Sequence, residues 1–153
     1  MEDFLFSLED SSLGLLISSS IWGYPIALSL HALGMGVLVG ISVMLSLRVL
    51  GVAHAIPTSA ILPFWRIAIA GFIINLLSGT ALFFGSASSL ATNWAFLAKL
   101  AFLALSLMLT FRLVKAAYKT QATSAETHRF LALGSLASWA ITIVFGRIIG
   151  YIF

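Results

Sequence analysis

The sequence predicts an all-α integral membrane protein, an antiparallel four-helix bundle with a short N-terminal interfacial helix. Three observations predict this fold class. Of the 153 residues, 61% are hydrophobic, and the mean hydropathy is +1.11. Only 8% of the residues are charged, whereas about a quarter are charged in a soluble domain. The chain also holds four apolar segments, and a membrane-spanning helix needs about 20 apolar residues.

The whole chain is expected to form one transmembrane domain with four spans, at residues 24–50, 60–84, 93–118 and 127–152. Residues 11–23 are too short and too rich in serine to form another span, and Trp22 suits a membrane interface. We expect this segment to be the interfacial helix, with Pro25 in the first turn of the following span. Residues 85–93, GSASSLATN, are interpreted as a loop that ends in the helix-cap candidate Asn93.

Charge predicts the orientation of the bundle. The cations that flank the first and third connections are Arg48, Arg66, Arg112, Lys115, Lys119 and Arg129. By the positive-inside rule, this end faces the cytoplasm and both chain termini face outward. The net charge of +3 therefore reflects topology rather than nucleic-acid binding. The absence of cysteine excludes disulfides, thiolate metal sites and cysteine-ligated iron–sulfur clusters.

Each span carries a polar residue at one depth in the outer half of the membrane. His31 and Lys99 each lie six residues from the outer end of their helix, at Pro25 and Asn93, which is about 9 Å at helical rise. The other two spans place further polar residues in this layer: Asn75, Ser78 and Arg147. No acidic residue lies in any predicted span to neutralise Lys99 and Arg147. Intramembrane ionisable residues usually face a bundle interior or a cavity.

His31 has three possible roles: cofactor ligand, proton carrier, or a structural hydrogen-bonding residue between helices. Gly34 lies close to its face of the helix and would leave room for a flat group. A haem could bind through the imidazole, with its propionates toward Lys99 and Arg147. No other histidine shares this depth, so the haem would be five-coordinate or take Lys99, water or another subunit's ligand. Gly36 and Gly40 form a GxxxG pair, which favours close helix packing.

The cations and the remaining histidines also have simpler interpretations. Lys99 and Arg147 could extend to the outer headgroups, as long cationic side chains often do. The indole of Trp94 and the neighbouring Asn93 already anchor that helix end, which favours the site role for Lys99. His54 and His128 belong to the cytoplasmic edge, where a solvated structural role is expected. Two histidines without a carboxylate are a weak indication of a metal site.

Two stretches of the sequence carry a family resemblance. LHALGMGVLVG…LRVLGVAH, from residue 30, resembles the first helix of a group of small bacterial four-helix membrane proteins. This group includes the copper-resistance D type and the membrane-bound protoporphyrinogen oxidases, together with related domains of unknown function. The shared pattern is an intramembrane histidine, small residues, a helix-end arginine and a further histidine, here His31, Gly34 to Gly40, Arg48 and His54. SGTALFFG…NWAFLAKLAFLAL is similar to their later helices and matches their Lys-Leu pair at Lys99.

The resemblance implies a haem-binding or redox-linked protein of the bacterial inner membrane, and its oxidase branch implies haem b. By the positive-inside rule above, both termini would then lie on the periplasmic side. The oxidase branch further implies porphyrin chemistry. This chain has Leu38 and Leu47 near the positions where that branch carries a tryptophan and a Pro-Arg step. This departure argues against enzymatic activity.

The sequence therefore supports a main functional hypothesis and two alternatives. The main hypothesis is a haem b protein that transfers electrons, alone or as a subunit of a larger membrane complex or homo-oligomer. The first alternative is a cofactor-free structural or assembly subunit, and the second is a porphyrinogen-oxidising enzyme. The candidate site residues are His31, as the expected ligand of the haem iron, with Gly34, Asn75, Ser78, Lys99 and Arg147.

Overall fold

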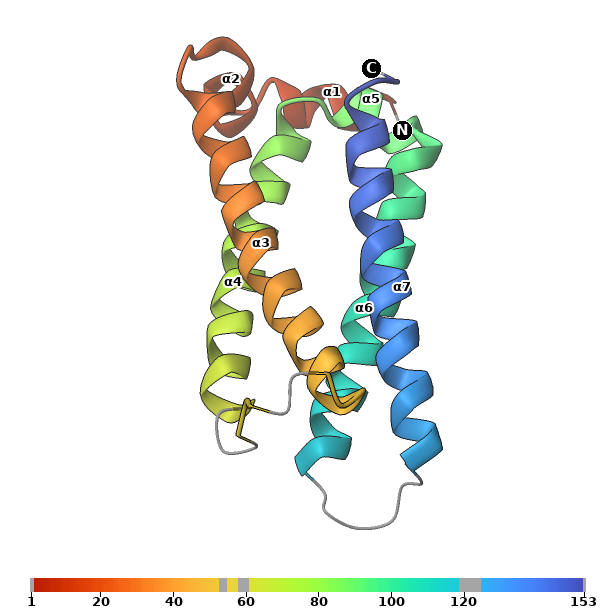
Figure 1. Ribbon diagram of the computed structural model, residues 1–153. Coiled ribbons are helices and arrows are strands. Elements are labelled where there is room, and N and C mark those ends of the chain that lie inside the picture. Colours follow the sequence, from red (N-terminus) through yellow and green to blue (C-terminus); the bar gives the residue numbers. More distant parts are fainter. Residues whose placement is uncertain (1, 53–54, 58–60, 119–124, 153) are drawn as a thin grey trace.

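A computed structural model describes residues 2–52, 55–57, 61–118 and 125–152 of the chain (Figure 1). Throughout these residues the regular structure is helical, which confirms the all-α fold class. In chain order the helices are α1 (Glu2–Glu9), α2 (Ser12–Ser19), α3 (Gly23–Val49), α4 (Ile61–Phe84), α5 (Ala87–Thr92), α6 (Trp94–Tyr118) and α7 (Ala125–Ile149).

Four of these helices, α3, α4, α6 and α7, are long and apolar enough to cross a membrane. Their bounds agree with the predicted spans to within one helical turn. Large apolar side chains cover their outer faces; Leu33, Leu77 and Phe130 are each about two-thirds exposed or more. Such surfaces are suited to lipid contact, because hydrocarbon tails solvate apolar side chains while the helices satisfy their own backbone groups. The chain is a multi-pass membrane protein.

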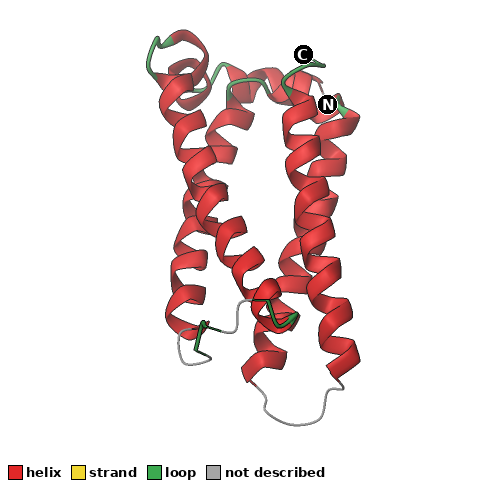
Figure 2. Cartoon of the chain, viewed as in Figure 1, coloured by secondary structure: helices red, strands yellow, loops and turns green. Residues whose placement is uncertain are grey.

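The bundle consists of two helical hairpins. α3 packs along α4, α6 packs along α7, and α3 joins the two hairpins through its contact with α7. Figures 1 and 2 show the two hairpins side by side, with α3 in the middle of the molecule. The core between the hairpins is formed by Leu38, Ala68 and Trp139, all buried. A second buried cluster contains Leu45 and Leu113.

The two ends of the bundle differ in composition. One end carries α1, α2, α5 and both termini (Figure 1), and we call it the α5 end. The opposite end, which we call the arginine end, carries Arg48, Arg66 and Arg112. There, α3 ends at Val49, and Gly51 lies two residues beyond it with a φ of 82°. Glycine adopts this conformation without a Cβ penalty. The Nε atom of Arg48 donates to the Ile56 carbonyl at 2.6 Å and fixes the chain that follows.

The predicted interfacial helix is present as α2, which begins after Ser11. The Ser11 hydroxyl accepts a hydrogen bond from the Gly14 N–H at 3.2 Å and caps the helix. Pro25 lies in the first turn of α3, as predicted. The Oδ1 atom of Asn93 accepts from the Ala95 N–H at 2.9 Å, which confirms Asn93 as the cap of α6.

Two short helices at the α5 end differ from the sequence-based prediction. α1 was not expected, and residues 85–93 contain the helix α5 instead of only a loop. The two helices pack against each other. The Glu9 carboxylate of α1 accepts hydrogen bonds from the N–H and the hydroxyl of Ser88 in α5, both at 2.7 Å. A contact between residues so far apart in the chain stabilises both segments and leaves no local sequence signal.

Candidate functional site

His31 and Asn75 hold α3 and α4 together through two hydrogen bonds. The Nδ1 atom of His31 lies 3.0 Å from the Asn75 main-chain carbonyl oxygen. In return, the side-chain amide of Asn75 donates to the His31 carbonyl oxygen at 2.9 Å. Asn75 is buried and His31 is half-buried. The orientation of the imidazole is therefore fixed by the neighbouring helix.

Two more residues of α4 complete the surroundings of the ring. The Ser78 hydroxyl lies 3.4 Å from Nδ1 of His31 and donates to the Ile74 carbonyl at 2.6 Å. Gly79 faces the imidazole, because a Cβ at that position would lie 2.9 Å from Cε1 of His31. A side chain at Gly79 would displace the ring, so this glycine provides the space that the imidazole occupies.

Lys99 approaches the other ring nitrogen from the second hairpin. Its Nζ atom lies 3.4 Å from Nε2 of His31. The end of its side chain runs beside Gly146 of α7, where a Cβ would lie 3.5 Å from Cε of Lys99. All five acidic residues of the chain are outside the spans, and no carboxylate within the described residues pairs with Lys99. Residues of all four spanning helices thus surround the pair of His31 and Lys99, in which the hydrogen-bond acceptor of a half-buried cation is an imidazole nitrogen.

These contacts indicate the tautomer of His31. A carbonyl oxygen only accepts hydrogen bonds, so Nδ1 must carry the proton that it donates to Asn75. An ammonium group only donates, so Nε2 must present its lone pair to Lys99. With Lys99 as an ammonium, these contacts fit a neutral imidazole, in which Nδ1 carries the proton and the lone pair of Nε2 faces Lys99.

Gly34 does not leave room for a flat group, contrary to the prediction from sequence. A Cβ at Gly34 would lie 2.7 Å from the Asn75 backbone nitrogen and 2.8 Å from the Gly71 carbonyl oxygen. Gly71 faces back in the same way, with the Gly34 oxygen 3.0 Å from its own Cβ position. Gly34 and Gly71 therefore form the close contact of α3 with α4, and Gly79 provides the space for the His31 ring itself.

The GxxxG pair at Gly36 and Gly40 does not pack within this chain. No atom of the described residues lies within 4 Å of a Cβ built at either glycine. Both positions are exposed. The prediction that this pair mediates close helix packing is wrong for the contacts inside the bundle, because α3 presents its Gly34 face to α4 instead.

Arg147 lies apart from the His31 group. Its guanidinium carbon is 5.5 Å from the centre of the Tyr151 ring, and the side chain is exposed. No described hydrogen bond joins Arg147 to His31 or to Lys99. Of the six predicted site residues, the structure brings His31, Asn75, Ser78 and Lys99 together, uses Gly34 for helix packing and places Arg147 at the surface.

Sequence reasoning missed Gly79 and Gly146, which lie against the site, and a pair of aromatic rings on the same two helices as Gly79 and Lys99. Phe83 of α4 and Phe96 of α6 stack with ring centres 5.7 Å apart. Phe83 follows Gly79 by four residues and Phe96 precedes Lys99 by three, so this stack lies about one turn closer to the α5 end. The signal in the sequence was the spacing. Gly79 lies four residues after Asn75 and Phe96 lies three residues before Lys99, so each shares a helix face with a predicted site residue.

The other histidines do not form a metal site in the part of the chain that is described. His54 lies outside the described residues. His128 is half-buried, and its Nε2 atom is buried without a hydrogen-bond partner among the described atoms. Across the described ranges, no group of three or more His, Cys, Asp or Glu side chains could hold a metal ion. A haem iron differs from such sites, because the porphyrin itself supplies four ligands.

Comparison of the chain with protein-family models, with curated proteins and with solved structures finds no match. The geometry of the His31 site is therefore the basis for the functional assignment that follows.

Proposed function

We propose that this chain is a haem b-binding electron-transfer protein of the bacterial inner membrane, with Nε2 of His31 as the ligand of the iron. The observation that carries the proposal is the pair of contacts that the His31 ring makes. Its Nδ1–H points to the Asn75 carbonyl, and its Nε2 lone pair points into the bundle between the two hairpins. Histidines that bind metals usually donate their second ring N–H to a carbonyl or carboxylate in this way.

The residues present fit a haem by their chemistry. A neutral histidine nitrogen is an axial ligand that haem iron accepts, and the bound group would supply one-electron redox chemistry. Binding at Nε2 requires the Lys99 ammonium to leave its present position. Its flexible four-carbon stem lies beside Gly146, so the ammonium can move without a change in the helices.

Lys99 is the cation that this proposal assigns to a haem propionate. It lies inside the bundle without a carboxylate partner in the described part of the chain, so an anionic ligand would neutralise it. Arg147 is exposed and stacks on Tyr151, so its contribution is the weaker of the two. The family resemblance of the first and later helices supports the same assignment.

The distribution of charge supports the proposed membrane placement. The arginine end carries most of the cations, so by the positive-inside rule it faces the cytoplasm. The α5 end, with both termini and α1, then faces the periplasm. In this orientation the His31 site lies in the periplasmic half of the membrane.

One observation favours a second function, that of a cofactor-free structural subunit. The two hydrogen bonds between His31 and Asn75, with the Gly34 contact, already explain three of the predicted residues by helix packing. The exposed Gly36 and Gly40 would then face another membrane subunit or a second copy of this chain. In this function Lys99 would only join the two hairpins through its contact with Nε2 of His31, whereas the haem proposal also gives its charge a partner.

The visible spectrum of the purified protein tests the proposal. The protein, expressed in bacterial membranes with haem supplied, should show a Soret band that shifts when dithionite reduces the iron. His31→Ala should remove the band while the helix content measured by circular dichroism stays unchanged. A colourless, folded protein that takes up no added haem would support the structural function and would overturn the haem proposal.

Lys99→Gln separates the role of the cation from that of the ligand. We expect the Soret band to persist, with weaker haem retention and a lower reduction potential, because a positive charge near the iron favours the added electron. Lys115→Gln is the matched control, since Lys115 lies at the arginine end over the Phe111 ring. Equal haem retention and potential in both variants would remove Lys99 from the site.

A further inference from the structure

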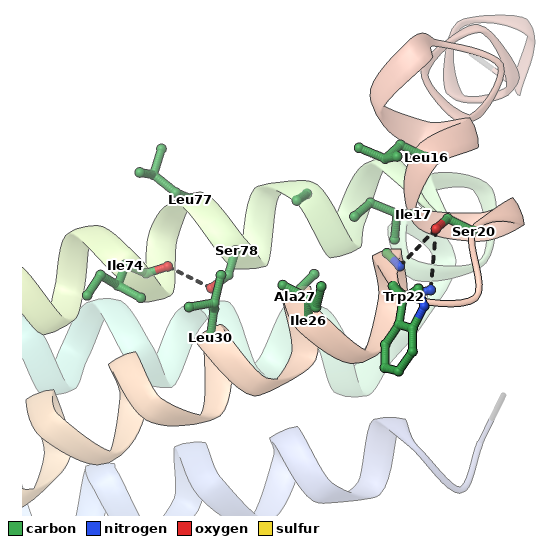
Figure 3. Close-up of a pocket in the computed structure, with 12 residues that line it drawn as sticks. Leu16, Ile17, Ser20, Trp22, Ile26, Ala27, Leu30, Ile74, Leu77 and Ser78 are labelled. Carbon is green, nitrogen blue, oxygen red and sulfur yellow. Dashed lines mark hydrogen bonds between the residues drawn. The ribbon is translucent and has the colours of Figure 1, made fainter.

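A groove lies between α2, α3 and α4 at the α5 end of the bundle (Figure 3). Its volume is about 520 Å³, within the range of about 300–1,000 Å³ that is typical of small-molecule sites. The walls are apolar and include Ile26, Leu30, Ile74 and Leu77. These four side chains are each more than 40% exposed, so the groove is accessible from the lipid rather than from the core.

The groove is suited to a chain-like molecule that enters from the membrane. The interfacial helix α2 covers its end nearest the membrane surface with Leu16 and Ile17, and Trp22 stands beside this end (Figure 3). Ser20 provides the hydroxyl at this end, and it accepts hydrogen bonds from the N–H groups of Trp22 and Gly23, each at 3.3 Å. The rest of the groove offers hydrocarbon contacts only, apart from Ser78 at its inner part.

The surrounding charge indicates an uncharged head group. The sequence contains no lysine or arginine before Arg48, and the segments next to the groove carry Glu9 and Asp10 instead. None of the residues that line the groove is a lysine or an arginine, so a phosphate head group in the groove would meet no cation in its walls. Charge complementarity therefore disfavours an anionic phospholipid and favours a neutral amphiphile with an apolar tail.

The groove also shares a residue with the His31 site. Ser78 lines the groove, and its hydroxyl lies 3.4 Å from Nδ1 of His31. A molecule in the groove is therefore separated from the imidazole by a single side chain. An electron-transfer protein needs a partner that donates or accepts electrons, and a partner in this groove would lie next to the proposed ligand.

From these observations we propose that the groove binds an isoprenoid quinone, with its ring at the inner part of the groove beside Ser78 and the isoprenoid tail along α3 and α4 toward α2. The choice of a quinone over other neutral amphiphiles rests on the proposed electron-transfer function, since quinones are neutral lipid-dissolved electron carriers. The groove itself, its apolar walls and its contact with Ser78 do not depend on that function.

The test measures the quinone that accompanies the full-length protein. The protein is extracted from bacterial membranes with its surrounding lipid in polymer-bounded discs, and quinone and phospholipid are quantified per chain. We expect the ratio of quinone to phospholipid to exceed that of the whole membrane by about tenfold, which is a preference of about 1.4 kcal/mol. An unchanged ratio, with phospholipid alone in the discs, overturns the proposal.

A pair of variants on α4 locates the binding. Ala81 lines the groove, and Ala81→Phe should abolish the enrichment because the phenyl ring fills the space that the tail needs. Ala70→Phe is the matched control, since Ala70 is exposed on the same helix and does not line the groove. Leu30→Ala removes part of one wall on α3 and should reduce the enrichment without filling the groove. Equal enrichment in all three variants and the wild type overturns the proposal.

The His31→Ala variant separates this inference from the haem proposal. Enrichment that is lost in Ala81→Phe and kept in His31→Ala supports the groove, whether or not the wild type binds haem. Haem binding without quinone enrichment overturns the groove and leaves the haem proposal standing.

Discussion

In each of the two hairpins, polar contacts hold the paired helices together, and the kind of contact differs between the hairpins. Between α6 and α7, hydroxyl groups bond to one another: Ser106 lies 3.3 Å from Thr142, and Thr110 lies 3.1 Å from Ser135. The Trp139 indole donates to Thr110 at 3.1 Å. Between α3 and α4, the Gly34–Gly71 approach is combined with the two hydrogen bonds of His31 and Asn75.

The difference lies in what each set of groups leaves unused. The hydroxyls between α6 and α7 are fully buried and all have partners inside the hairpin. The imidazole of His31 uses only Nδ1 within its own hairpin, and Nε2 points away to Lys99. Polar groups whose hydrogen bonds are all made within one hairpin stabilise that hairpin. His31 instead directs Nε2 toward the bundle interior, where this nitrogen is available for binding when Lys99 moves away.

The largest effect on stability is expected at the core between the hairpins. Trp139 is 1% exposed, and Trp139→Ala should reduce the free energy of unfolding by about 3–5 kcal/mol. The measurement is unfolding in mixed micelles. Trp94→Ala, at a 59% exposed indole, is the control and should cost far less. Equal losses would mean that the hairpins are not joined through Trp139.

The next effect concerns the glycines of α3. Gly34→Val should reduce the free energy of unfolding by about 1–3 kcal/mol, because the new side chain meets the α4 backbone. Gly36→Val should be close to neutral, since that position is open. The same unfolding assay compares the two variants. A larger effect at Gly36 than at Gly34 would contradict the helix contact described above.

A smaller effect is expected from the hydroxyls between α6 and α7. Thr110→Val removes the acceptor of the Trp139 indole, and hydrogen bonds between membrane helices contribute about 0.6 kcal/mol on average. Haem content, measured by the Soret absorbance per protein, should not change. A loss of haem in Thr110→Val would show that the hydroxyls between α6 and α7 also contribute to haem binding, and would contradict the functional difference between the two hairpins.

The smallest effect is expected at the α5 end, in the contact of α1 with α5. Hydrogen bonds from the N–H and hydroxyl of Ser88 lower the pKa of the Glu9 carboxyl below its ordinary value. A lowered pKa in the folded state means that the contact is fully present above the ordinary pKa and is lost as the pH falls through the lower one. The protection of the α1 amides against hydrogen exchange, corrected for the intrinsic exchange rate at each pH, should therefore decrease as the pH falls below the ordinary pKa of a glutamic acid.

Glu9→Gln tests the origin of that pH dependence. The α1 amides of the variant should already be less protected against hydrogen exchange at neutral pH. Their protection should not fall further on acidification. Glu2→Gln is the control, because Glu2 has no described hydrogen bond and should leave the pH profile unaltered. The same acid-induced exchange in Glu9→Gln as in the wild type would assign the transition to another group.

The sequence was sufficient to predict the four spans and the meeting of His31, Asn75, Ser78 and Lys99. The spans follow from length and apolar composition, and the polar layer follows from helical rise in antiparallel helices. The faces of the helices were not predictable in the same way. Because α3 is apolar on all sides, its periodicity did not indicate that Gly34 rather than Gly36 contacts α4. The α1–α5 contact depends on Glu9 and Ser88, which are distant in the chain, and so it had no local signal.

The central claim is that Nε2 of His31 is unprotonated and becomes the coordinating atom of this bundle when Lys99 moves away. The most direct test is nitrogen NMR of protein labelled with ¹⁵N only in histidine, with the His31 signals assigned by their loss in His31→Ala. In the haem-free protein, we predict that Nδ1 of His31 is protonated and Nε2 is not. Added haem should then shift or broaden the His31 signals and leave those of His54 and His128 in place. A proton on Nε2 of His31, or His31 signals that do not respond to haem, would contradict the account.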